Sequence, residues 1–96
     1  MDKRYTPLSP ADQLRQRIAL LEEISQQPGM PLAQAVRQLR TGLRLTVPEY
    51  ARLTGVAVRT IHAVEAGTAN PAIETADKLL KPFGLKLGVV AIPTGT

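Results

Sequence analysis

The stretch Leu45-Thr46-Val47-Pro48-Glu49-Tyr50-Ala51-Arg52-Leu53-Thr54-Gly55-Val56-Ala57-Val58-Arg59-Thr60-Ile61-His62-Ala63-Val64-Glu65-Ala66-Gly67 predicts two short helices joined by a tight turn. Thr46 is a good N-cap for the first helix, and Pro48 suits its first turn. Gly55 ends this helix, because glycine adopts a positive φ at little cost. The second helix is therefore expected to begin almost at once and to cross the first.

The two helices are expected to pack together through their apolar sides. The residues predicted to share that packing are Tyr50, Ala51 and Leu53 in the first helix and Ala57, Ile61 and Val64 in the second. The opposite side of the second helix carries the candidate reading face, which consists of Val58, Arg59, His62 and Ala63. This arrangement is a helix-turn-helix, although a helical hairpin used only for packing is the alternative.

The motif also resembles the XRE (lambda-repressor-like) family over roughly Leu32 to Gly84. The matching features are Arg40, the Leu45-Thr46 entry, Tyr50-Ala51 where the family usually has leucine-alanine, Leu53-Thr54-Gly55-Val56, Arg59-Thr60-Ile61, Glu65, Gly67 and Asn70-Pro71. The resemblance implies a DNA-binding domain that places its second helix in the major groove. It also implies a structural ion pair between Arg40 and Glu65, which fixes the helix before the motif against the recognition helix.

By matching position, the resemblance places the reading face at base edges. Arg59 is expected to bond a guanine in bidentate fashion, and Val58 to pack on a thymine methyl group. For His62 the alternative is an ordinary solvated side chain. The residues expected to contact phosphates are Arg44, Thr46, Arg52, Thr60, Thr68 and Asn70.

Three positions depart from the family pattern and reduce the expected number of polar DNA contacts. Val47 stands where a glutamine commonly follows the helix cap, Ala57 where a serine often begins the recognition helix, and Ala72 where a helix cap is frequent. DNA binding is therefore expected to depend on dimerisation or on a partner that adds contacts.

Composition favours one small helical domain that binds a polyanion. The chain has 96 residues, a net charge of +4 and only three aromatic residues, so aliphatic side chains must fill its core. Between Pro31 and Thr68 the sequence has five arginines and only two acidic residues, Glu49 and Glu65. This excess of positive charge suits binding to DNA, although an ordinary solvated surface is the alternative. The arginines are Arg37, Arg40, Arg44, Arg52 and Arg59.

Several classes of protein are not expected. With no cysteine, disulfides and thiolate metal sites are excluded. No apolar run approaches the roughly 20 residues that span a bilayer, and no signal peptide is evident, so we expect a soluble, cytoplasmic protein. One histidine, no glycine-rich phosphate loop and no carboxylate cluster argue against an enzyme, a metal site and a cofactor.

Residues 1–30 form the predicted N-terminal extension. Met1 to Leu8 is expected to be extended or disordered, with Lys3 and Arg4 as a possible phosphate-binding arm. Ser9 is expected to cap a helix that runs to about Gln27. Its apolar stripe is too broad for the seam of a two-stranded coiled coil, so we expect it to pack on a wider surface. That surface could belong to the same domain, to a second subunit or to a different protein. The stripe contains Ala11, Leu14, Ile18, Leu20, Leu21 and Ile24.

Residues 31–84 form the predicted DNA-binding domain, and residues 85–96 a dimerisation strand and tail. Pro31 opens a helix, and another is expected from about Ala72 to Lys81. Beyond Gly84 the pattern alternates every two residues, which predicts a strand. Its dimer-facing residues would be Leu85, Leu87, Val89 and Ala91. A lone strand leaves backbone groups unpaired, so we expect the same strand of a second copy to pair with it.

The predicted fold class is mainly α, a five-helix lambda-repressor-like domain with an extra N-terminal helix and a short C-terminal strand pairing across a dimer. A terminal strand in this position resembles the HipB-type branch, which consists of antitoxins that repress their own operon and bind a HipA-type kinase. The predicted function is a homodimeric repressor of this kind, with double-stranded operator DNA as its main partner. The alternative is a protein-interaction module with little DNA binding of its own.

Overall fold

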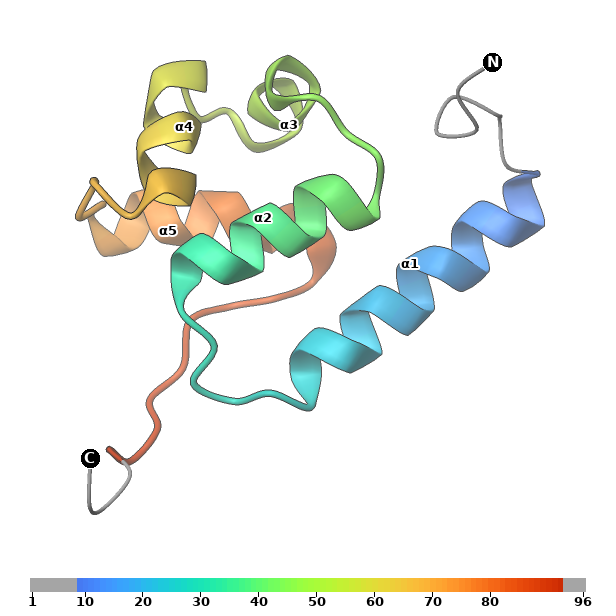
Figure 1. Cartoon of the computed structure of the whole chain (residues 1–96), viewed down its shortest axis with the longest axis horizontal. Helices are drawn as coiled ribbons and strands as arrows, with labels where there is room; N and C mark the ends of the chain where they lie inside the picture. The colour runs from blue at the N-terminus through green and yellow to red at the C-terminus, as the bar shows by residue number, and fades with distance from the viewer. Residues whose placement is uncertain (1–8, 93–96) are drawn as a thin grey trace.

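In the computed structural model, residues 9–92 are described, and they form five α-helices and one 3-10 turn. The elements are α1 (Pro10–Ser25), α2 (Leu32–Gly42), α3 (Val47–Thr54), α4 (Val58–Ala66), α5 (Ile73–Leu80) and η2 (Lys81–Phe83). In Figure 1, α2 lies in front of α5, and α3 and the start of α4 lie together at the top. The C-terminal segment leaves at the bottom, and α1 occupies the right side. The predicted mainly helical class is confirmed for the described residues.

Local sequence signals explain where α1 and α3 begin. The Ser9 side chain accepts a hydrogen bond from the Asp12 amide at 3.1 Å. At α3, Thr46 Oγ1 accepts from the Glu49 amide at 3.2 Å, and Glu49 Oε1 accepts from the Thr46 amide at 2.8 Å. This reciprocal capping box satisfies two backbone donors that a helix start leaves unpaired. Gly55, with φ of 75°, ends α3, so the predicted helix-turn-helix is present.

The core is organised around Tyr50, which is fully buried. Its hydroxyl donates to the Leu79 carbonyl at 2.6 Å, and its ring stacks on Phe83 with 5.4 Å between ring centroids. Burial raises the pKa of the Tyr50 hydroxyl, and the negative charge of Glu65 raises it further, so the group remains a proton donor. Tyr50 therefore ties α3 to α5 and η2. The other fully buried large side chains are Val36, Leu39, Ile61 and Leu79.

The N-terminal helix α1 packs against α2 with one of its faces. Gln16 Nε2 donates to the Gly42 carbonyl at 2.7 Å, and Arg17 donates to the Pro82 carbonyl at 3.2 Å. The approach is close, because a Cβ atom at Gly42 would lie 2.7 Å from Leu20 Cδ2. Of the three surfaces considered for α1, its own domain thus accounts for at least one face.

The strand predicted from Leu85 onward, expected to pair across a dimer, is absent from the described residues of the single chain. Residues 85–92 carry no strand assignment, and Leu85 alone among the predicted strand residues is half-buried. Leu87 is 42% exposed and Val89 is fully exposed, and Ala91 is also exposed. The physical reason is that a strand requires a hydrogen-bonded neighbour, and no strand or bridge is assigned anywhere in residues 9–92.

Three smaller expectations are also corrected. The domain between residues 31 and 84 has four α-helices and η2, so five is the count with α1 included. Leu53 is 54% exposed, because its position on α3 turns it away from the side that buries Tyr50. Ala57 is the exposed N-cap of α4 and does not face inward. The arm proposed at Lys3 and Arg4 lies outside the described residues.

Candidate nucleic-acid interface

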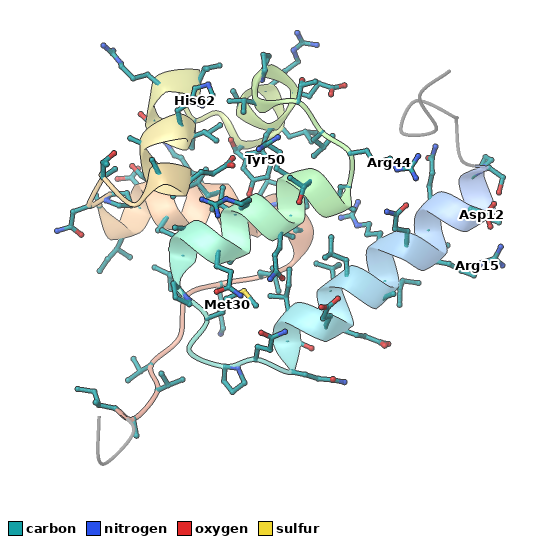
Figure 2. All side chains as sticks on the ribbon, viewed as in Figure 1. Asp12, Arg15, Met30, Arg44, Tyr50 and His62 are labelled. Carbon is teal, nitrogen blue, oxygen red and sulfur yellow. The ribbon has the colours of Figure 1, made fainter. Side chains whose placement is uncertain are left out.

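The outward side of α4 carries the predicted reading face. Val58 is 38% exposed, and Arg59 and His62 are exposed, whereas Ala63 is half-buried. The inward side of the same helix buries Ile61 and Val64 in the core. Figure 2 shows Tyr50 inside the helical cluster and His62 on α4 at its outer part. Core packing therefore decides which side of α4 is available to a ligand.

The turn between α3 and α4 is held by the buried Thr54 side chain. Its hydroxyl donates to the Tyr50 carbonyl at 2.9 Å and accepts from the Val56 amide at 3.2 Å. The hydroxyl thus bonds to backbone on both sides of Gly55, where φ is positive. With Val56 buried as well, the turn fixes the direction in which α4 leaves α3.

A charged pair fixes α4 against α2. Arg40 donates two hydrogen bonds to the Glu65 carboxylate, at 2.7 Å and 2.9 Å, and a third to the Leu45 carbonyl at 3.3 Å. The Arg40 and Glu65 side chains are only 22% and 11% exposed. The hydrogen bond to Glu65 raises the pKa of the Arg40 guanidinium. The structure thus brings together the two residues expected to form the structural ion pair.

Arg37 is a second link from α2 to α4 that sequence reasoning missed. Its guanidinium donates to the backbone carbonyl of Glu65. The available signal was its spacing, because Arg37 precedes Arg40 by one helical turn and therefore lies on the same side of α2.

The residues expected at phosphates do not all lie together. Thr46 begins α3, Arg52 is exposed on α3, and Thr60 is half-buried on α4. Thr68 and Asn70 are exposed in the loop after α4, where the Thr68 hydroxyl donates to the Ala63 carbonyl at 3.3 Å. The set is thus spread over α3, α4 and the loop after α4.

Arg44 differs from the rest of this set. It lies in the loop between α2 and α3 with φ of 58°, a left-handed conformation that is rare outside glycine. Figure 2 shows its side chain pointing toward the N-terminal part of α1 and away from His62. In this arrangement Arg44 contributes charge beside the motif without joining the reading face.

The surface of the helix-turn-helix is positively charged, because its two carboxylates are bound within the chain. Glu65 is paired with Arg40, and the carboxylate of Glu49 is bound in the α3 cap. The hydrogen bonds from Thr46, first from its amide and then from its hydroxyl, lower the pKa of Glu49. At α4, Ala57 supplies no side-chain acceptor, so the first-turn amides are uncapped and their partial positive charge favours an anion.

Leu53 was assigned to the wrong face and is a further candidate contact. It is exposed near the end of α3, and Val58 is exposed at the start of α4, after a turn of three residues. Aliphatic side chains at these places suit thymine methyl groups or sugar edges. The sequence carried little signal for this, since Leu53 follows Tyr50 by three residues and Thr54 follows it by four, and both spacings place a residue near Tyr50 on the helix.

Two further features of residues 9–92 bear on metal binding and on membrane insertion. Within that range, no group of three or more histidine, aspartate and glutamate side chains is placed to hold a metal ion. None of the helices described there combines the length and the apolar character needed to traverse a bilayer.

The fold and the exposed face of α4 together define a helix-turn-helix protein. A family model described as helix-turn-helix matches residues 36–90 of the chain. The chain therefore belongs to the XRE-type helix-turn-helix family, a family of DNA-binding regulators, and the resemblance at this level is confirmed. Among the curated proteins and the solved structures, none gives a significant match.

Proposed function

We propose that this protein is a cytoplasmic, sequence-specific transcriptional regulator that binds a palindromic DNA operator as a homodimer. The observation that carries the proposal is the face of α4, on which Val58, Arg59 and His62 are exposed while Ile61 and Val64 anchor the helix. A rigid helix with an exposed arginine and small neighbours fits the major groove. Arg52 and the uncapped first turn of α4 add attraction for phosphates.

Within this proposal, Arg59 reads a base and Arg52 contacts a phosphate. The test begins with selection of a preferred duplex from a randomised pool by the full chain. Arg59→Ala is then expected to lose discrimination at one base pair in each half-site, about 1–3 kcal/mol, because its bidentate hydrogen bonds to guanine are lost. Competition binding against single-base variants of the selected duplex measures the effect.

Arg52→Ala is the matched control, since it also removes one exposed arginine from the motif. It is expected to weaken binding to all sequences about equally and to reduce the slope of log affinity against log salt by about one. An Arg59→Ala protein that still prefers the selected duplex as strongly as the unmodified chain would remove Arg59 from base readout.

The dimer part of the proposal rests on the C-terminal segment. Val89 is fully exposed, and Ile92 is 86% exposed, so two aliphatic side chains lie in solvent. Two hollows of about 270 Å³ and 260 Å³ lie beside the segment, and Leu87 lines both. A second copy that pairs its own residues 85–92 with these would supply the missing strand partner and fill apolar space.

The finer proposal is an antitoxin that represses its own operon and binds a HipA-type kinase. It is supported by the position of the C-terminal segment directly after the last helix, where the HipB-type branch carries its pairing strand. Co-expression with the products of adjoining genes, followed by co-purification, tests this assignment. A kinase-like protein that binds the chain and is inhibited by it would support the proposal, whereas the lack of any such neighbouring gene would contradict it.

A protein-interaction module is the second candidate function. It is favoured by the loss of polar side chains at the DNA surface, because Ala57 and Ala72 begin α4 and α5 without a side-chain hydrogen bond. Salt dependence separates the two functions. Steep salt dependence with selection of one palindromic site indicates the regulator, and a flat, non-selective response indicates the interaction module.

A further inference from the structure

The broad apolar stripe of α1 is divided by the fold into two faces. One face is used within the chain, where Ile24 is buried in the core and Leu20 packs on Gly42. Gln16 and Arg17 reinforce this contact through their bonds to the Gly42 and Pro82 carbonyls. Leu21 also packs against the core, so the docking of α1 on its own domain leaves Ala11, Leu14 and Ile18 exposed.

The second face is exposed over its N-terminal part and has the spacing of a helix-pairing seam. Ala11, Leu14, Ile18 and Leu21 follow one another at intervals of three, four and three residues, and the last of them, Leu21, is half-buried and also packs against the core of its own chain. Leu14 is 59% exposed and Ile18 is 48% exposed. Intervals of three and four are those that place apolar residues along one line against another helix. The occupant that this face fits is an α-helix.

Charges beside the seam match a second copy of the same helix. Arg15 and Glu22 lie seven residues apart along one edge of the seam, and both are exposed. Arg15 also forms an exposed salt bridge with Asp12 one turn earlier, which a contact with a second copy would share or replace. In an antiparallel pair this edge of one helix lies beside the same edge of the other, so Arg15 of each copy meets Glu22 of its partner. In a parallel pair this edge would lie beside the opposite edge of the other helix, where Arg17 is bonded to Pro82 and Ile24 is buried.

We propose that this face of α1 binds α1 of a second copy of the chain in antiparallel orientation. The contact is distinct from the dimer proposed at residues 85–92, because α1 runs along the right side of Figure 1 while the C-terminal segment leaves at the lower left. The labelled Arg15 points outward from that side in Figure 2. The α1 contact therefore joins dimers to one another.

The assembly has a consequence for DNA that rests on the proposed function. The apolar area of the seam is small, so the contact is weak between free molecules. Two dimers held on neighbouring operator sites experience a high effective concentration, and the same contact then makes their binding cooperative.

The first experiment measures association of the full chain without DNA, by sedimentation at low salt over a range of protein concentrations. Arg15→Glu and Glu22→Arg are each expected to weaken association beyond the dimer by roughly tenfold, because each places like charges together at both ends of the seam. The double variant Arg15→Glu/Glu22→Arg exchanges the charges and is expected to restore it. Glu23→Arg, the same charge change on the next residue, is the control and is expected to have no effect.

The second experiment determines the orientation, using the absence of cysteine from the chain. Arg15→Cys and Glu22→Cys proteins are mixed and oxidised. The antiparallel pair is expected to give mostly the mixed disulfide between positions 15 and 22. Predominance of 15–15 and 22–22 disulfides, single charge reversals without effect, or a wild-type chain that does not associate beyond the dimer would each overturn the proposal. Since DNA takes no part in either assay, these results are independent of whether the chain binds an operator.

Discussion

At the scale of single residues, the orientation of the reading face depends on a few polar side chains that are buried or nearly so. Tyr50 bonds the Leu79 carbonyl, Thr54 bonds both sides of the turn, and Arg40 holds Glu65. The Tyr50 and Arg40 bonds cross between helices, and the Thr54 hydroxyl joins the last turn of α3 to the Val56 amide in the turn that follows. Removing one partner leaves the other buried without compensation, which costs more than the bond itself contributes.

The strongest prediction at this scale concerns Arg40. Arg40→Met is expected to lower the free energy of unfolding by about 3 kcal/mol, because the Glu65 carboxylate stays largely buried without its partner. Urea denaturation followed by circular dichroism measures the loss. The double variant Arg40→Met/Glu65→Leu is expected to be less destabilised than Arg40→Met alone, since no buried charge remains.

Arg37→Met is the control for this prediction. Arg37 is exposed and bonds only to the Glu65 backbone carbonyl, so its loss is expected to cost no more than about 1 kcal/mol. If Arg40→Met destabilises the chain no more than Arg37→Met, the ion pair does not hold α4 to α2.

At the scale of the elements, α3 is a helix of eight residues that relies on its cap. Isolated helices of this length are marginal in water, so end effects matter. Thr46→Ala is expected to cost about 1 kcal/mol of stability, because it removes the acceptor for the Glu49 amide. Thr46→Ser keeps that acceptor and is expected to stay close to the original stability in the same urea titration.

The capping box also predicts a pH dependence with a defined sign. The pKa of Glu49 is lowered in the folded chain, so its contribution is fully present above the unfolded value of about 4.3. That contribution is lost as the pH falls through the lower folded value. Glu49→Gln is expected to show a smaller decrease in stability between about pH 5 and pH 3 than the original chain. Identical pH profiles for the two proteins would contradict the role of the carboxylate.

At the scale of the whole molecule, the DNA face and the C-terminal segment lie at opposite ends of the view in Figure 1. Pairing through residues 85–92 would therefore leave both copies of α4 free. A two-fold axis that places the recognition helices about one turn of DNA apart, roughly 34 Å, fits two half-sites. In the proposed dimer, the oligomeric state would set the affinity for DNA without any change in the reading face.

The prediction at this scale is that removing residues 85–96, or introducing Leu87→Pro, yields monomers. These proteins are expected to keep the helical signal in circular dichroism, because the last buried core residue is Phe83, and Leu85, which packs on the core, is only half-buried. They are expected to lose high-affinity binding to the selected palindromic duplex, since one half-site supplies only part of the contact area. Light scattering measures the molar mass, and a chain lacking only residues 93–96 is the control. An unchanged dimer after the longer truncation would place the dimer interface elsewhere, with α1 as the next surface to test.

The sequence by itself determined the features that depend on local chemistry. Gly55 and the Thr46 cap predicted the helix-turn-helix, since positive φ and side-chain capping act within a few residues. The family and the candidate reading face on α4 followed from the same stretch. The spacing of apolar residues also indicated α1, with its end displaced by two residues from the predicted one.

Only the tertiary structure decided which apolar residues are covered. The stripe of α1 reads as one broad surface in the sequence, yet Ile24 is buried and Ile18 is half exposed, because α2 and η2 reach only one side of the helix. Leu53 and Tyr50 are both apolar residues of α3, and the position of α5 buries Tyr50 alone. The alternation after Gly84 predicts a strand, but a strand forms only where a second segment lies alongside it. Such pairing depends on segments distant in sequence or on another molecule, and local pattern carries no information about either.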